Sequence, residues 1–83
     1  MNEFRKLYKK IITEGSDSIK FSDFQYFIEH LGFSCVRING DHFIYRMDSI
    51  IDQINIQPNG NSAKEYQVKQ VRKIVKKYKL GGD

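Results

Sequence analysis

Cysteine, proline and tryptophan are almost missing from this 83-residue chain, which has one cysteine, one proline and no tryptophan. A lone Cys35 excludes an internal disulfide and fits a reducing compartment, so we expect a cytoplasmic protein. Cys35 falls in a β-prone run, where an unpaired cysteine usually packs as a small apolar side chain, and we expect it to be buried. No apolar run approaches a membrane span, and "MNEFRKLYKK" has no signal-peptide core, so no membrane partner is expected.

Histidine is also scarce, with only His30 and His42. A metal site needs several converging ligands, and Asp41, Asp48 and Asp52 follow no recognisable ligand spacing. A chain of this length forms one small domain and can hardly build the deep cleft of a two-carboxylate glycosidase. We therefore expect a single domain over residues 1–83, with no metal and no cofactor.

Positive charge is abundant and unevenly placed. The formal net charge is +4, and residues 64–80 hold seven cations against one acid, Glu65. Such asymmetry points to a polyanionic partner, which includes nucleic acid, an acidic protein or a membrane surface. Charge alone does not choose among them, because many basic helices are merely solvated.

Two amphipathic helices are expected before residue 33. Asn2 can cap the start of the first helix, and Glu14-Gly15-Ser16 can close it. For the second helix, Ser22 and Gln25 form a capping box at its start, and Gly32 suits a left-handed C-cap at its end. Apolar residues at helical spacing form the two buried faces: Phe4, Leu7, Tyr8, Ile11 and Ile12 in the first, then Phe24, Phe27, Ile28 and Leu31 in the second.

The period then changes to that of strands. A hairpin is indicated by Asn39-Gly40, which lies between the β-prone runs "FSCVRI" and "HFIYR". A third strand is indicated by "DQINIQ", whose apolar and polar residues alternate so that one face is solvent-exposed. Residues Pro58 to Asn61 end this strand. A last helix opens with a capping box at Ser62 to Glu65, or a few residues later, and Gly81-Gly82 stops it. Its buried stripe consists of Val68, Val71, Ile74, Val75 and Tyr78.

The expected order is therefore α-α-β-β-β-α, an α+β fold with a three-stranded antiparallel sheet and helices on one face. Residues 20–80 have the order of the double-stranded-RNA-binding domain. Residues 1–15 form an N-terminal extension helix.

The hairpin decides how His42 is placed. With Asn39 and Gly40 as the central residues of a type I′ turn, His42 lies opposite Arg37, whereas a three-residue loop would give it another partner. One face then carries Phe33, Cys35, Arg37, His42, Ile44 and Arg46. The other, which we expect to face the core, carries Ser34, Val36, Ile38, Asp41, Phe43 and Tyr45.

An exposed histidine suits RNA chemistry. Histidine exchanges a proton near neutral pH, and RNA supplies its own nucleophile in the 2′-hydroxyl. His42 is thus a candidate general acid/base, with Arg37 as a possible phosphate contact. The spacing by itself favours the alternative, an ordinary solvent-exposed histidine beside a turn.

Cations of the last helix form a candidate RNA-binding surface. Four of them share one side, almost opposite the apolar stripe, and one more lies at the helix start. These five are Lys69, Arg72, Lys73 and Lys76, with Lys64 before them. Such a stripe suits phosphate contacts, and a solvated charged face is about equally consistent with the pattern.

Together these residues resemble the HicA family of toxins from prokaryotic toxin–antitoxin systems. The matching features are Gly32-Phe33, Gly40-x-His42, the Ile-Asn-Ile strand and a last helix opening Lys64-x-Tyr66-Gln67-Val68. The resemblance covers roughly residues 20–80. It implies a double-stranded-RNA-binding-like fold, metal-independent endoribonuclease activity on mRNA, His42 as the catalytic residue, and a HicB-like antitoxin as partner.

One position departs from the family pattern. The family commonly has serine where this chain has Asp41, whose carboxylate would repel phosphate or orient the imidazole. Two other hypotheses therefore stay open. One is a non-catalytic RNA- or DNA-binding module on the same fold, and the other is a protein-interaction domain whose basic helix meets an acidic partner.

Overall fold

The structure is a computed structural model that describes residues 2–13 and 19–81. Its elements are α1 (Glu3–Thr13), α2 (Phe21–Leu31), β1 (Ser34–Asn39), β2 (His42–Arg46), β3 (Ile54–Ile56), β4 (Pro58–Asn59), β5 (Ser62–Ala63) and α3 (Glu65–Tyr78). The α+β class and the three-stranded antiparallel sheet, in the order β1-β2-β3, are confirmed. The short β4–β5 ribbon was not expected from the sequence. Within the described ranges, no helix is both long and apolar enough to cross a membrane.

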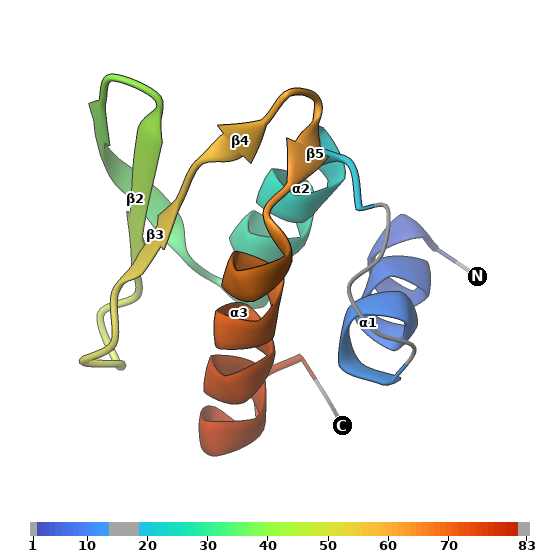
Figure 1. Cartoon of the computed structure of the whole chain (residues 1–83). Helices are drawn as coiled ribbons and strands as arrows, with labels where there is room; N and C mark the ends of the chain where they lie inside the picture. The colour runs from blue at the N-terminus through green and yellow to red at the C-terminus, as the bar shows by residue number, and fades with distance from the viewer. Residues whose placement is uncertain (1, 14–18, 82–83) are drawn as a thin grey trace.

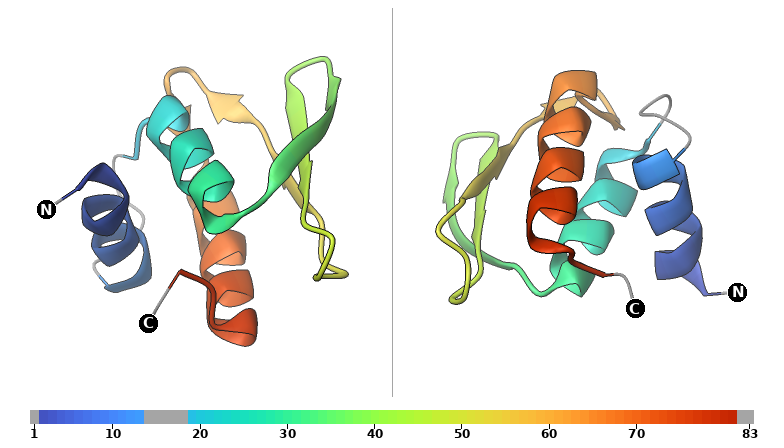
Figure 2. Two further views of the ribbon diagram at one scale, coloured as in Figure 1. Left: turned by 180° about the vertical axis from the view of Figure 1, so that it is seen from behind. Right: turned by 90° about the horizontal axis from the view of Figure 1, so that it is seen from below.

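The elements form three layers (Figures 1 and 2). The sheet is outermost, α2 and α3 pack against one of its faces, and α1 lies on the far side of these two helices. A single buried cluster joins the layers through Leu7 of α1, Phe27 of α2, Tyr45 of β2 and Val71 of α3. The helices leave the other face of the sheet uncovered, as the sequence predicts.

Helix α1 contributes buried residues to the core. Its start is capped as predicted, since Oδ1 of Asn2 accepts the backbone N–H of Arg5 at 2.8 Å. Leu7 and Ile11 are buried, and the ring of Phe4 stacks on Phe27 with centroids 5.4 Å apart. The predicted closing residues 14–16 lie outside the described residues.

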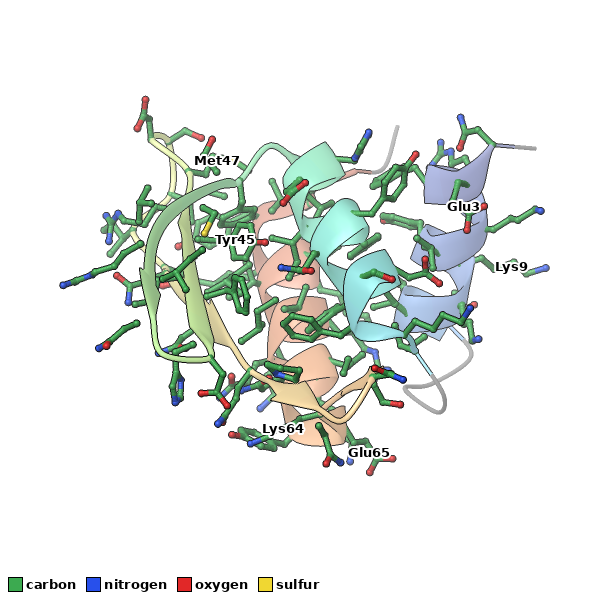
Figure 3. The ribbon with its side chains drawn as sticks, turned by 90° about the horizontal axis from the view of Figure 1, so that it is seen from above. Glu3, Lys9, Tyr45, Met47, Lys64 and Glu65 are labelled. Atoms are coloured by element: carbon green, nitrogen blue, oxygen red, sulfur yellow. The ribbon has the colours of Figure 1, made fainter. Side chains whose placement is uncertain are left out.

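Helix α2 begins one residue before the predicted cap. Its N-cap is Lys20 and no side chain caps it, so the Ser22–Gln25 capping box is wrong. Gln25 instead donates from Nε2 to Oη of Tyr45 at 3.4 Å, in the space between α2 and the sheet where Figure 3 places Tyr45. The predicted C-cap is confirmed, because Gly32 has a φ of 116° and donates its N–H to the carbonyl of Glu29.

The β1–β2 turn is shifted from the predicted one. Asn39 pairs with His42, so Gly40 and Asp41 form the tip, and Arg37 pairs with Ile44 instead of His42. A type I′ turn on Asn39-Gly40 would require a positive φ at Asn39, whereas only Gly40 has one here, at 66°. Glycine first in a two-residue loop is the type II′ pattern.

The core face of β1 was also predicted incorrectly. Phe43 and Tyr45 of β2 do face the helices, opposite Ile56 and Ile54. Val36 and Ile38, however, are 56% and 59% exposed, and Cys35 is exposed rather than buried. The reason is that β1 is an edge strand with a bulge between Cys35 and Arg37, and the helices cover β2 and β3 instead.

Of the two predicted starts of α3, the capping box at Ser62 is wrong and the start a few residues later is confirmed. Ser62 and Ala63 belong to β5, which pairs with β4 around Gly60 and Asn61, and the helix begins at Glu65. The β4–β5 ribbon also joins the chain before α2, since the N–H of Ala63 reaches the carbonyl of Ile19 at 2.8 Å. Residues of the predicted stripe do face the core: Val68, Val71 and Val75 are buried, and Ile74 and Tyr78 pack beside them.

Candidate nucleic-acid site

His42 is the first residue of β2 and lies at the base of the β1–β2 turn. It shares the open face of the sheet with Ile44, because Phe43 between them faces the helices. Its side chain is 46% exposed. The strand therefore fixes the backbone of His42 while its ring stays accessible to a large substrate.

The ring of His42 is held by Asn55 of β3. Nδ1 lies 3.1 Å from Oδ1 of Asn55. An amide oxygen only accepts, so this contact is a hydrogen bond in the tautomer with hydrogen on Nδ1, and in that tautomer Nε2 of the neutral ring can take a proton. Asn55 is on the same face because it lies opposite Ile44 and between the buried Ile54 and Ile56.

Asp41 lies on the other side of the ring. Its Oδ1 is 3.9 Å from Nε2 of His42, and its Oδ2 accepts the side-chain amide of Gln57 at 3.0 Å. The hydrogen bond from Gln57 is the main cause that holds the pKa of Asp41 below its ordinary value, with smaller contributions from His42 and Lys64. Asp41 is therefore ionised at neutral pH.

Gln57 joins the turn to the start of α3. Its Oε1 accepts a hydrogen bond from Nζ of Lys64 at 2.6 Å, and its backbone N–H donates one to Oε1 of Gln67 at 2.9 Å. Gln67 is only 4% exposed and fixes this connection within the core. Lys64, at the start of α3 in Figure 3, is thus part of the same polar network as His42.

Two arginines share the open face with His42. Arg37 is two positions from the cross-strand partner of His42, which makes it a diagonal neighbour. Arg46 donates from Nη1 to Oε1 of Gln53 at 3.3 Å. The predicted direct pair of Arg37 with His42 does not form, but positive charge still lies on this face.

The remaining cations of α3 are not beside His42. Lys69, Lys73 and Lys76 are exposed on α3, which packs against the opposite face of the sheet. Arg72 is half-buried, and its Nε donates to the carbonyl of Ile11 in α1 at 2.7 Å. Of the five predicted RNA-binding residues, only Lys64 is joined to the His42 network, and Arg72 is engaged in holding α1.

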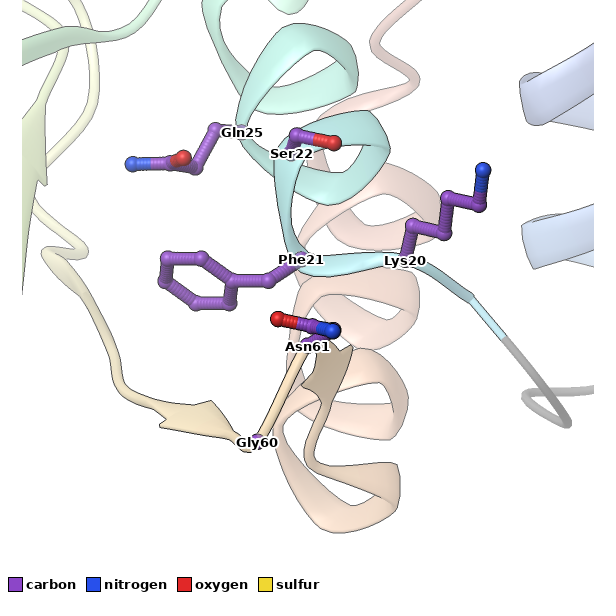
Figure 4. A pocket seen from close by; sticks show the side chains of 6 residues that line it. All are labelled: Lys20, Phe21, Ser22, Gln25, Gly60 and Asn61. Carbon is purple, nitrogen blue, oxygen red and sulfur yellow. The ribbon is translucent and has the colours of Figure 1, made fainter.

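Two hollows lie outside this network. One lies between α3 and the segment that precedes β3, and it is lined by Asp52, Gln53, Gln70, Lys73 and Ile74. Lys73 is the one predicted site residue among those that line it. The other lies between the start of α2 and the β4–β5 turn, where Lys20, Phe21, Ser22, Gln25, Gly60 and Asn61 line it (Figure 4). None of the predicted site residues borders the second hollow.

Sequence reasoning missed Asn55 and Gln57. The alternation of Ile54, Asn55 and Ile56 places Asn55 on the solvent-exposed face of the sheet, so the sequence pattern could have predicted that Asn55 lies on the same face as His42. Gln57 lies beyond β3, and its direction depends on the unexpected β4–β5 ribbon and the buried Gln67.

Comparison with protein-family models, curated proteins and solved structures finds no match. Among the described residues, no three His, Cys, Asp or Glu side chains converge as ligands of a metal ion.

Proposed function

We propose that this protein is a HicA-like endoribonuclease that cleaves mRNA and is neutralised by a HicB-like antitoxin in the cytoplasm. The observation that carries the proposal is the state of His42: an exposed ring with Nδ1 bound by Asn55 and Nε2 left to exchange a proton. Apart from the short β4–β5 ribbon, the α-β-β-β-α order from α2 to α3 supports a double-stranded-RNA-binding-like fold. The motifs around Gly40-x-His42 support the same family.

The reaction needs only the substrate, the protein and a water molecule. Nε2 of His42 takes the proton of the RNA 2′-hydroxyl as its oxygen attacks the adjacent phosphorus. The bond from phosphorus to the 5′-oxygen of the next nucleotide breaks, and that oxygen takes a proton from water. The upstream fragment then ends in a 2′,3′-cyclic phosphate.

Two cations can contact the phosphate during this reaction. Arg37 offers positive charge on the same face of the sheet as His42. Lys64, joined to the network through Gln57, is the α3 cation best placed to extend this contact.

A second function has one observation in its favour. The Asp41 carboxylate is ionised and lies 3.9 Å from Nε2, where it repels an approaching phosphate. This arrangement favours a module on the same fold that binds RNA or DNA through its cations and does not cut.

The decisive experiment incubates purified protein with RNA in the presence of EDTA and compares wild type, His42→Ala and His30→Ala. His30 is an exposed residue of α2 and serves as the matched control. The enzyme predicts cleavage and growth arrest that disappear with His42→Ala alone, while circular dichroism shows a folded domain. Binding without cleavage by wild type would support the module.

Salt dependence tests the protein-interaction hypothesis. Phosphate contacts predict an RNA affinity that falls steeply as salt rises, because counterions are released on binding. An RNA affinity that is negligible even at low salt would leave an acidic protein as the partner.

A further inference from the structure

Two polar groups beside His42 favour opposite tautomers of its ring. Oδ1 of Asn55 accepts from Nδ1 at 3.1 Å, whereas Oδ1 of Asp41 faces Nε2 from 3.9 Å. Both oxygens can only accept, so each favours a hydrogen on the nitrogen nearest to it. A distance of 3.1 Å allows a hydrogen bond and 3.9 Å does not, so Asn55 decides which nitrogen is protonated.

We infer that Asn55 is the positioning residue of this site: it holds His42 in the tautomer with hydrogen on Nδ1 and so keeps Nε2 free for the proton of the substrate. The catalytic role of Asn55, unlike its effect on the tautomer, rests on the proposed function. Without Asn55, the carboxylate of Asp41 on the other side of the ring would favour hydrogen on Nε2. A neutral ring with hydrogen on Nε2 cannot act there as a base.

The sheet gives Asn55 the rigidity that this role needs. Its two neighbours, Ile54 and Ile56, are 3% and 0% exposed and lie opposite Tyr45 and Phe43. The backbone of Asn55 is therefore fixed by buried side chains on both sides while its own side chain stays on the open face. A substitution at this exposed position removes the hydrogen bond and leaves the core intact.

The tautomer can be measured directly and without any RNA. In the full chain labelled with ¹⁵N-histidine, at about pH 8 where imidazole groups are ordinarily neutral, the ¹⁵N shifts of His42 should report hydrogen on Nδ1. Asn55→Ala should transfer it to Nε2. Asn55→Asp, whose carboxylate can still accept, should keep it on Nδ1.

The second histidine is an internal control. Nδ1 of His30 lies 2.9 Å from the backbone carbonyl oxygen of Tyr26, which also fixes hydrogen on Nδ1. Its signal should be the same in all three chains, which shows that any change at His42 is local. A wild-type His42 with hydrogen on Nε2, or an unchanged tautomer in Asn55→Ala, would overturn the inference.

Cleavage assays add the catalytic readout. Asn55→Ala should lower kcat on the order of tenfold to a hundredfold with KM nearly unchanged, a smaller loss than the roughly 10²–10⁴-fold expected for removing the general base itself. Asn55→Asp should recover most of the rate. A tautomer change in a protein that never cleaves RNA would contradict the proposed function and leave the positioning role standing. A tautomer change with an unaltered kcat would overturn the catalytic meaning of Asn55.

Discussion

Oδ1 of Asp41 lies 3.9 Å from Nε2 of His42, close enough for electrostatic interaction and too far for a hydrogen bond. Gln57 holds the other carboxylate oxygen at 3.0 Å and is itself bound to Lys64. The carboxylate is therefore fixed beside the ring by groups outside the turn. The carboxylate of Asp41 lies beside Nε2, the ring nitrogen that Asn55 leaves free. A phosphate that binds at Nε2 is therefore repelled by this negative charge.

Replacing Asp41 by serine, the residue common in the HicA family, should raise RNA affinity. Two like charges about 4 Å apart in water repel enough to change binding about fivefold. We therefore expect Asp41→Ser to bind single-stranded RNA about fivefold more tightly at low salt. Fluorescence anisotropy with a short labelled RNA measures the difference.

The matched control is Asp48→Ser, since Asp48 is an exposed aspartate in the loop after β2 and its loss changes the net charge equally. An equal gain in both variants would show that only net charge matters. Slower cleavage by Asp41→Ser, with RNA binding retained, would show instead that the carboxylate assists His42.

Arg72 is expected to contribute more to stability than to RNA binding. Its Nε donates to the carbonyl of Ile11, one of the last four carbonyls of α1, which have no partner within their own helix. Hydrogen bonds of charged groups contribute roughly 1.5–3 kcal/mol, so Arg72→Ala should lower the free energy of unfolding by about that amount. Urea denaturation followed by circular dichroism measures the loss.

Lys76→Ala provides the comparison, because Lys76 is an exposed residue of the same helix. Its stability should change by no more than about 0.5 kcal/mol. The contact between Arg72 and α1 would be unimportant if the two variants unfolded at the same urea concentration.

The helices were the most predictable part of the fold because their buried faces repeat with helical spacing. Leu7 and Ile11 in α1, and Phe24, Phe27 and Ile28 in α2, are buried as their spacing requires. Only the N-terminal capping boxes of α2 and α3 were wrong, because a capping box is a local signal. Gln25 instead donates a hydrogen bond to Tyr45 across the core.

The open face was predictable only in part. Alternation correctly placed His42 and Asn55 on one side of the sheet, because side chains of a strand alternate. The bulge in β1 and the shift of its turn from Asn39-Gly40 to Gly40-Asp41 depend on φ angles and edge position, which the pattern of apolar residues does not encode. The contact between Gln57 and Asp41 joins residues 16 apart and depends on the tertiary fold.

Tyr45 should make the fold sensitive to alkali. Its side chain is 1% exposed, and burial raises its pKa from 10.0 to about 12. Folding thus favours the neutral hydroxyl, which donates to Oε2 of Glu29 at 3.2 Å. The stabilisation is complete below pH 10 and is lost as the pH rises from 10 toward 12.

Tyr45→Phe tests this dependence. At neutral pH it should lose about 1 kcal/mol with the hydrogen bonds of the hydroxyl. Between pH 10 and 12 its unfolding free energy should fall less steeply than that of wild type. Chemical denaturation at several pH values measures both, and parallel curves for the two chains would contradict the assigned titration.

Two glycines should respond differently to alanine. Gly40 has a φ of 66°, and a Cβ at this position would meet no described atom within 4 Å. Gly40→Ala should therefore lower the free energy of unfolding only by the cost of a positive φ for alanine, about 1–2 kcal/mol. Gly32 has a φ of 116°, and its Cβ would lie 3.0 Å from Cε of Met47, so Gly32→Ala should lose more.

Asparagine at position 40 refines the comparison of the two glycines. Gly40→Asn should be milder than Gly40→Ala, because asparagine is more common than alanine at the positive-φ positions of such hairpin turns. Thermal unfolding ranks the three variants. A Gly40→Ala chain less stable than Gly32→Ala would show that the turn is more constrained than the end of α2.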